Sequence, residues 1–147
     1  MQPKEYSSHI EAILDPDERL HTLRWISGKL AGIDCDTIAV CGASGMLAVS
    51  VVDERPDVDV ILVRKKEDST HSKLPVEGVR GREYVIIDDL VSSGDTITHI
   101  VDSIKEFSPH SQCVGVLLYH PSRRNSPTYN VYTGESLTSF LDWCQDA

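Results

Sequence analysis

The stretch VIIDDLVSSGDTI, residues 85–97, contains an apolar strand, two acidic side chains and a hydroxyl-rich turn in immediate succession. Val85–Ile87 is a short β-branched run, typical of a strand that is buried on both faces. Asp88 and Asp89 come at the carboxyl end of this strand, which is where ligands bind in open α/β sheets. We therefore expect both carboxylates to lie outside the core and to take part in ligand binding.

A phosphate-binding turn is predicted directly after the two acids. Ser92, Ser93 and Thr96 supply hydroxyl groups, and Gly94 permits a positive φ and close approach of the backbone to a ligand. A helix is expected from about Asp95, so that free amides at its N-terminus point toward an anion. An ordinary capped helix start uses the same residue types, and the specific signal is therefore the order of strand, acids and turn.

The composition bounds the class of protein. The 147 residues suffice for one domain with its own core, and 40% hydrophobic with 25% charged residues is typical of soluble globular domains. No apolar stretch approaches the roughly 20 residues that span a bilayer, and the N-terminus does not have the pattern of a signal peptide, so we expect a cytoplasmic protein without membrane contact. The four cysteines are widely spaced, which predicts neither zinc sites nor disulfides.

The charge is unevenly distributed along the chain. The formal net charge of −9 argues against binding to nucleic acid or to acidic membranes. Residues 61–82 nevertheless carry six basic and three acidic side chains, whereas the segments before and after them are each at −6. One basic segment in an acidic chain suits a substrate that carries several phosphates.

The alternation of elements predicts a single α/β domain built on a mainly parallel twisted sheet with helices on both faces. Residues 64–78 hold no apolar period and are expected to form a long loop. A small cap is expected from residues 1–30 and 120–147, around a core at about 33–119. The expected strands cover residues 37–41, 57–63, 85–87 and 113–119, and the expected helices cover residues 17–30, 45–53 and 95–107.

A second anion-binding turn is predicted at Gly42–Gly45. It lies between the apolar strand at residues 37–41 and the helix that follows, so its backbone amides and the Ser44 hydroxyl are available to an anion at a helix N-terminus. A tight turn between a strand and a helix favours Gly and Ser for structural reasons as well.

The order of apolar strand, paired acids and phosphate turn resembles the signature of the type I phosphoribosyltransferases, which exchange the pyrophosphate of 5-phosphoribosyl-1-pyrophosphate (PRPP) for a nitrogenous base. The resemblance covers residues 38–119. It implies that Asp88 and Asp89 hold the ribose hydroxyls and that the turn from Val91 to Thr96 holds the 5′-phosphate. The turn at Gly42–Gly45 is similar to the family's pyrophosphate loop, although Cys41 stands where relatives often carry a charged residue.

The basic segment is similar to the family's flexible catalytic loop, which closes over PRPP. Arg64 and Lys65 match the Arg-Lys pair at this strand end in adenine and orotate enzymes, and Lys66 follows them. His71 resembles the orotate subgroup, but that subgroup has a further lysine just before its histidine, where this chain has Asp68–Thr70. The resemblance implies that Lys65 is catalytic and that Arg64, Lys66 and His71 contact PRPP.

Magnesium is expected as the cofactor. A departing pyrophosphate needs its developing charge neutralised, and Mg²⁺ does so while it keeps several waters. Asp88 and Asp89 are the expected partners of this ion, through its water shell. The protein would position the reactants and stabilise charge, with no covalent nucleophile.

The acceptor base stays open between orotate-like and purine. Enzymes that act on 6-oxopurines usually have an aspartate where this chain has Ser92, and adenine enzymes tend to carry a glutamate in the pyrophosphate loop, which Gly42–Gly45 lacks. Five aromatic side chains in the last part of the sequence could stack on a base or form the core of the cap: Tyr119, Tyr129, Tyr132, Phe140 and Trp143.

Two functional hypotheses follow. The first is an enzyme, expected as a homodimer, that makes a nucleoside monophosphate from PRPP and a nucleobase. The second is a regulatory protein of the same fold that senses PRPP or a nucleotide without turnover. A dinucleotide-binding or response-regulator domain is disfavoured, because the sequence lacks G-x-G-x-x-G and its paired aspartates come late in the chain.

Overall fold

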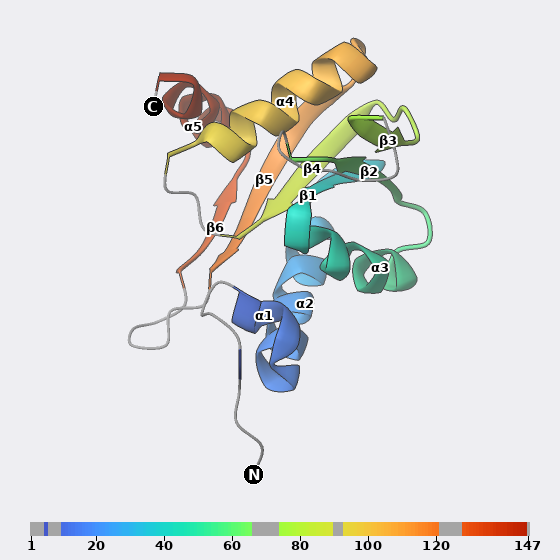
Figure 1. The fold of residues 1–147 in the computed structure, drawn as a ribbon, viewed down its shortest axis with the longest axis vertical. Coiled ribbons are helices and arrows are strands. Elements are labelled where there is room, and N and C mark those ends of the chain that lie inside the picture. The colour runs from blue at the N-terminus through green and yellow to red at the C-terminus, as the bar shows by residue number, and fades with distance from the viewer. Residues whose placement is uncertain (1–4, 6–9, 66–73, 90–92, 121–127, 147) are drawn as a thin grey trace.

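A six-stranded sheet with helices on both faces organises the chain (Figure 1). The computed structural model describes residues 5, 10–65, 74–89, 93–120 and 128–146. The strands are β1 (Thr37–Cys41), β2 (Asp59–Val63), β3 (Val76–Gly78), β4 (Glu83–Asp88), β5 (Gln112–His120) and β6 (Thr128–Tyr132). The helices are α1 (Glu11–Leu14), α2 (Pro16–Leu30), α3 (Gly45–Glu54), α4 (Asp95–Phe107) and α5 (Gly134–Asp146), with a 3₁₀ turn, η2, at Gly42–Ser44.

The strand order is β3-β2-β1-β4-β5-β6. The four central strands are parallel, and β3 and β6 pair antiparallel at the two edges. This arrangement confirms the predicted α/β class and the mainly parallel sheet. It also brings β1 and β4 side by side, although a helix and two strands separate them in sequence.

Two hydrophobic cores lie on opposite faces of the sheet. Alternate residues of β1 divide between them, so that Ile38 and Val40 pack under α1, α2 and α3 whereas Ala39 and Cys41 pack under α4 and α5. Figure 1 shows these two helical layers on either side of the strands. Burial on both faces explains why the central strands appear in the sequence as continuous apolar runs.

The helices follow the periodicity of the sequence closely. In α4, Ile97, Ile100 and Ile104 are buried against the sheet, which is the spacing of one helix face. Pro16 occupies the first turn of α2, where its missing N–H costs nothing, and the Asp15 carboxylate accepts a hydrogen bond from the Glu18 amide at 3.0 Å.

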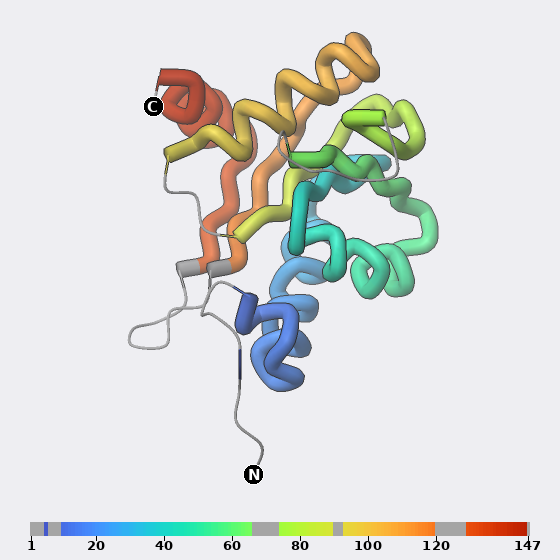
Figure 2. Tube along the Cα trace, in the orientation of Figure 1, coloured from blue at the N-terminus to red at the C-terminus, as the bar shows by residue number. Residues whose placement is uncertain are grey.

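The structure differs from the sequence-based expectation at both sheet edges. The segment expected as a loop at residues 64–78 contains β3, a three-residue strand that pairs with β2. The segment expected as a cap at residues 120–147 provides β6, which is hydrogen-bonded to β5, and α5, which packs beside α4 (Figure 2). Both differences arise because a strand pairs antiparallel with the strand that follows it in the chain, and the apolar pattern of these short edge segments does not report that pairing.

No helix in the described part of the chain combines the length and the apolar composition needed to cross a lipid bilayer.

Candidate active site

The two predicted anion-binding turns lie next to each other, at the carboxyl ends of β1 and β4. From β1 the chain turns through η2 into α3 on one face of the sheet, and after β4 it enters α4 on the opposite face. Neighbouring strands whose connections leave toward opposite faces form a topological switch point, where open α/β sheets bind their ligands. The fold therefore places both turns at the position where a ligand site is expected.

The sheet separates at this position. The ladder between β1 and β4 joins Thr37 to Tyr84 and ends with Ala39 paired to Ile86. Beyond that pair, β1 continues against β2 alone, and β4 continues against β5 as far as Asp88. The carboxyl ends of β1 and β4 are thus free to flank a ligand.

The first turn has the backbone geometry that an anion site requires. Gly42 has φ +61°, in the left-handed region that favours glycine. No side chain caps the N-terminus of α3, so its first amides are not satisfied by a capping group. Ala43 is exposed, whereas Ser44 is buried at 2% exposure, so the hydroxyl predicted to face the ligand points into the protein.

Lys65 extends over this turn. A Cβ placed on Gly42 would stand 2.6 Å from the Lys65 Cε and 3.2 Å from its Nζ. The ammonium group also acts on Asp88, where its charge favours the ionised carboxylate. The predicted catalytic lysine is therefore brought to both the pyrophosphate turn and the acid pair.

A cavity of about 720 Å³ opens between Lys65 and the start of α4. It is lined by polar side chains and one thiol: Cys41, Lys65, Asp95, Thr96, Thr98, His99 and Asp102. Asp95 and Thr96, both assigned to the phosphate turn from the sequence, thus share one cavity with the lysine.

The phosphate turn leads into α4 through Gly94, which has φ +80°. The Ser93 Oγ accepts a hydrogen bond from the Asp95 amide at 3.4 Å, and Ser93, Asp95 and Thr96 are exposed. Gly94 itself is buried against α5. A Cβ at this position would stand only 2.7 Å from the Cα of Cys144 in that helix. The glycine is therefore required by the backbone of α5 as well as by its own φ.

The two acids have different surroundings. Asp88 is the last residue of β4 and only 5% exposed, whereas Asp89 follows the strand and is half-buried. Burial raises the pKa of Asp88 to about 6, and the charge of Asp89 adds to this effect, while the Ser44 hydrogen bond and Lys65 oppose it. The expectation that both acids stand outside the core is thus wrong for Asp88.

Asp88 is held by a buried hydrogen-bonded chain. The Ser44 Oγ donates to the Asp88 Oδ1 at 3.1 Å and lies 2.8 Å from the Tyr119 hydroxyl. The sequence places Tyr119 at the end of the apolar strand expected at residues 113–119 and also among the aromatics that could stack on a base. At 1% exposure its ring belongs to the core, as its place in that apolar run indicates.

Arg64 is paired with β3. Its guanidinium donates to the Glu77 carboxylate of β3 at 2.5 Å, and its carbonyl oxygen contacts the His99 Nε2 at 2.7 Å. The bond to Glu77 uses one nitrogen of the guanidinium, so the ion pair holds Arg64 against β3. His99, which no sequence pattern singled out, ties α4 to the backbone immediately before Lys65.

Four predicted ligand contacts lie outside the described residues: Lys66, His71, Val91 and Ser92. The predicted residues that the structure brings together are Gly42, Ala43, Gly45, Lys65, Asp88, Asp89, Ser93, Gly94, Asp95 and Thr96. Ser44 belongs to the same region but faces inward, and Arg64 lies toward β3.

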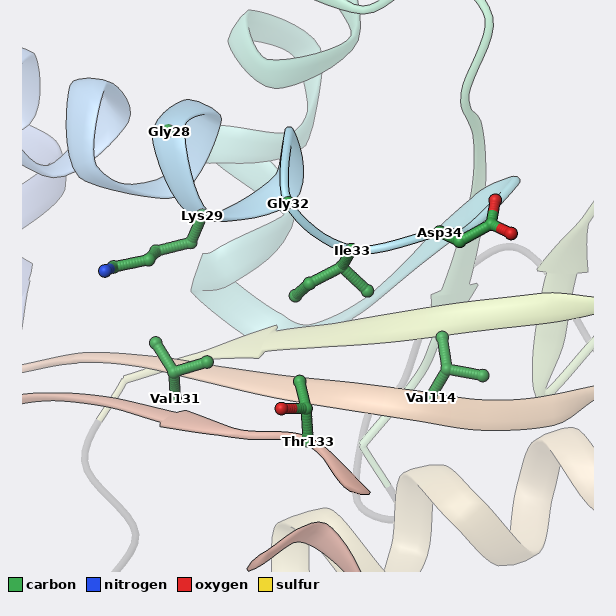
Figure 3. A pocket seen from close by; sticks show the side chains of 8 residues that line it. All are labelled: Gly28, Lys29, Gly32, Ile33, Asp34, Val114, Val131 and Thr133. Atoms are coloured by element: carbon green, nitrogen blue, oxygen red, sulfur yellow. The ribbon is translucent and has the colours of Figure 1, made fainter.

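A second hollow, of about 540 Å³, lies at the opposite end of the sheet (Figure 3). Val114 of β5 and Val131 of β6 point from the sheet toward Ile33, which follows α2. Neither predicted turn nor either acid contributes to its lining. The residues assigned from the sequence thus belong to the carboxyl edge of the sheet and not to this hollow.

Curated proteins with similar sequences include a phosphoribosyltransferase and a ribose-phosphate pyrophosphokinase. A hypoxanthine/guanine phosphoribosyltransferase of Methanococcus maripaludis is 28% identical over 120 residues, which covers 69% of this chain and 65% of that protein. A ribose-phosphate pyrophosphokinase of Methanobrevibacter smithii is 28% identical over 92 residues, covering 63% of this chain and 29% of that protein. The chain therefore spans less than two thirds of either relative.

Solved structures share the fold. The UMP synthase of Leishmania donovani superposes with a TM-score of 0.61 at 21% identity, covering 81% of this chain and 27% of that one. The orotate phosphoribosyltransferase of Mycobacterium tuberculosis, in complex with inorganic phosphate, gives 0.58 at 21% identity, covering 74% and 60%.

One protein family matches most of the chain. The phosphoribosyl transferase domain family matches residues 45–146, which is more than half of the sequence and includes both acids and the turn at Gly94. The resemblance predicted from residues 85–97 is thereby confirmed: the chain belongs to the type I phosphoribosyltransferase family.

Proposed function

We propose that the protein transfers the 5-phosphoribosyl group of PRPP to a nitrogenous base and releases pyrophosphate. One observation carries this proposal: two amide-rich turns and an acid pair converge where β1 and β4 separate. PRPP has a phosphate at one end, a pyrophosphate at the other and two ribose hydroxyls between them. The turn at Gly94 suits the phosphate, the turn at Gly42 the pyrophosphate, and Asp89 and Asp88 the ribose.

Each residue has a proposed role in this reaction. The exposed residues Ser93, Asp95 and Thr96 supply amides and hydroxyls to the 5′-phosphate. Lys65, which lies over Gly42, stabilises the charge that develops on the leaving pyrophosphate. Arg64, Lys66 and His71 are proposed to contact PRPP as well, with Arg64 held against β3 by its ion pair with Glu77.

Magnesium is the proposed cofactor, because the donor set suits this ion. Asp88 and Asp89 offer hard carboxylate oxygens beside the turns proposed for the phosphates, and Mg²⁺ prefers one or two carboxylates together with phosphate oxygens and water. When bound, it would neutralise pyrophosphate as the bond to the sugar breaks.

The direct test is turnover. The protein is incubated with PRPP, Mg²⁺ and each of orotate, hypoxanthine, guanine and adenine, the bases named for its relatives and structural neighbours, and pyrophosphate release is measured. Release with one of these bases, lost in the Asp88→Asn/Asp89→Asn double variant, supports the proposal. PRPP binding without release under every condition would contradict it and favour the sensor.

We expect the active form to be a homodimer in the cytoplasm, where a charged phosphorylated sugar is retained. The outer face of α3 carries two exposed apolar side chains, Met46 at 57% and Val49 at 72%, which a second copy could cover. Sedimentation equilibrium of the protein and of its Val49→Asp variant tests this expectation, since a dimer through α3 would dissociate in the variant.

A further inference from the structure

Three buried polar side chains connect three separate elements of the site. Asp88 ends β4, Ser44 ends the turn after β1, and Tyr119 lies in β5. Their exposures are 5%, 2% and 1%, so water does not satisfy their polar atoms. Each must find its partners within the protein, because an unpaired buried polar group is costly.

The proton positions follow from the chemistry of the serine. A hydroxyl has a single proton, and the Ser44 Oγ–H donates to the Asp88 carboxylate at 3.1 Å. At the 2.8 Å contact with Tyr119, Ser44 must therefore accept, and the tyrosine O–H must donate. Burial raises the pKa of Tyr119, which keeps this donor protonated.

The chain of hydrogen bonds spans the place where the sheet separates. The pairing of β1 with β4 ends at Ala39 and Ile86, before either strand reaches its turn. Beyond that point, the bond from Ser44 to Asp88 joins the pyrophosphate turn to β4. Tyr119 supports this bond from β5, with its ring fixed in the core beneath α2 and α3.

We propose that Tyr119 is a positioning residue for PRPP, because its hydroxyl holds Ser44 in the orientation that fixes the Gly42–Gly45 turn against Asp88. Tyr119 itself does not touch the ligand. This inference rests on the proposed function, since it assigns the turn to the pyrophosphate of PRPP. It also explains why Ser44 faces inward: the serine orders the turn, and the backbone amides are left to meet the anion.

Four variants test the proposal. Tyr119→Phe removes only the hydroxyl and keeps the ring in the core. Ser44→Ala removes the middle of the chain, and the double variant removes both. The matched control is Tyr84→Phe, which deletes the hydroxyl of another core tyrosine, 3% exposed, at the opposite end of β4 and on the other face of the sheet.

Two measurements separate positioning from general stability. Hydrogen exchange without ligand follows the amides of residues 42–46, and calorimetric titration with PRPP and Mg²⁺ gives the affinity. Tyr119→Phe should increase exchange in that segment and weaken PRPP binding by about three- to tenfold, the scale of one lost hydrogen bond. In turnover assays it should raise the KM for PRPP and leave the KM for the base unchanged. Tyr84→Phe should leave both the exchange and the affinity near those of the wild type.

The double variant shows whether Tyr119 acts through Ser44. If it does, the double variant binds PRPP as Ser44→Ala does, because the tyrosine has no further route to the turn. Additive losses would overturn the inference, and so would an unchanged PRPP affinity in Tyr119→Phe while the wild type binds PRPP. Failure of the wild type itself to bind PRPP would instead overturn the proposed function, and with it any positioning role toward this ligand.

Discussion

The side chain of Lys65 lies directly over Gly42, so that a Cβ at Gly42 would stand 2.6 Å from the Lys65 Cε. The glycine is therefore needed twice, for its φ of +61° and for the space that the lysine occupies. Because the obstructing atom is near the end of a flexible side chain, a substitution at Gly42 should displace Lys65 before it disturbs the fold.

Gly42→Ala should consequently weaken PRPP binding more than it lowers stability. We expect a loss of about 1–2 kcal/mol in the free energy of unfolding from the left-handed backbone alone, measured by urea denaturation, and a clear rise in the Kd for PRPP. Gly134→Ala is the control, because Gly134 has φ +56° and no atom within 4 Å of the added Cβ. Equal PRPP affinity in the two variants would argue against the role of the Lys65 contact.

Gly94→Ala should act mainly on stability. Its Cβ would meet the backbone of α5, at 2.7 Å from the Cys144 Cα and 3.0 Å from the Cys144 carbonyl oxygen, and backbone cannot move aside cheaply. We expect a loss of about 2–4 kcal/mol, from left-handed strain together with overpacking. The same Gly134→Ala variant reports the strain alone, so the difference between the two unfolding curves measures the contact. A Gly94→Ala variant as stable as Gly134→Ala would contradict the packing of α5 against this turn.

Lys65→Ala should lower kcat more than it raises the KM for PRPP. A lysine that meets the leaving pyrophosphate gains most as negative charge develops, so its loss falls on the transition state. Steady-state kinetics at saturating base separates the two parameters. Lys105→Ala, which removes an equal charge from the last turn of α4, should leave both unchanged. A rise in KM with an unaltered kcat would assign Lys65 to ground-state binding only.

Asp88→Asn should stabilise the protein at neutral pH while it abolishes turnover. Burial raises the pKa of Asp88 from 3.8 to about 6, with a contribution from Asp89. Because the folded state holds this proton more tightly than the unfolded state, stability is fully present below about pH 4 and declines as the pH rises to about 6. Ionising Asp88 thus costs on the order of 3 kcal/mol at pH 7, which a neutral amide avoids.

Asp36 is the matching comparison, because its pKa is shifted in the direction opposite to that of Asp88. Burial alone would raise its pKa, but hydrogen bonds from the Arg82 amide, the Thr37 hydroxyl and the Glu83 amide outweigh burial and lower it. The stability that Asp36 contributes is therefore present above its unfolded pKa and is lost as the pH falls. Urea unfolding between pH 3.5 and 8 should show Asp36→Asn destabilised at neutral pH and Asp88→Asn stabilised there. The same sign for both variants would contradict this account of Asp88.

Periodicity predicted the central elements well because the apolar pattern of each one shows within its own sequence which side chains are buried. The strand at residues 37–41 and the helix at residues 95–107 have the bounds expected from their apolar patterns. The strand β3 has three residues and one buried side chain, Val76, so its sequence carries no period. It forms because β2, the preceding strand, offers a free edge, and the sequence of β3 itself carries no sign of this pairing.

The chemistry of the site was predictable from residue types, but the direction of each side chain was not. Asp88 is the last, buried residue of β4, whereas Asp89 lies beyond the strand and is half-buried, and the sequence does not show where the strand ends. Ser44 points inward because it forms a hydrogen bond with Tyr119, and the two residues come together only when β5 is in the sheet. Arg64 likewise meets Glu77 only once β3 has paired with β2.

The contact of α5 with the turn at Gly94 also sets an order of assembly during translation. Cys144 follows Gly94 in the chain by the whole of α4, β5 and β6 and most of α5. Domains begin to form while the ribosome is still adding residues. A nascent chain halted in β6 would already contain every residue assigned to PRPP, yet the turn at Gly94 would lack the helix that packs behind it. Maturation of the phosphate turn is thus tied to α5, a helix that leaves the ribosome after all of these residues.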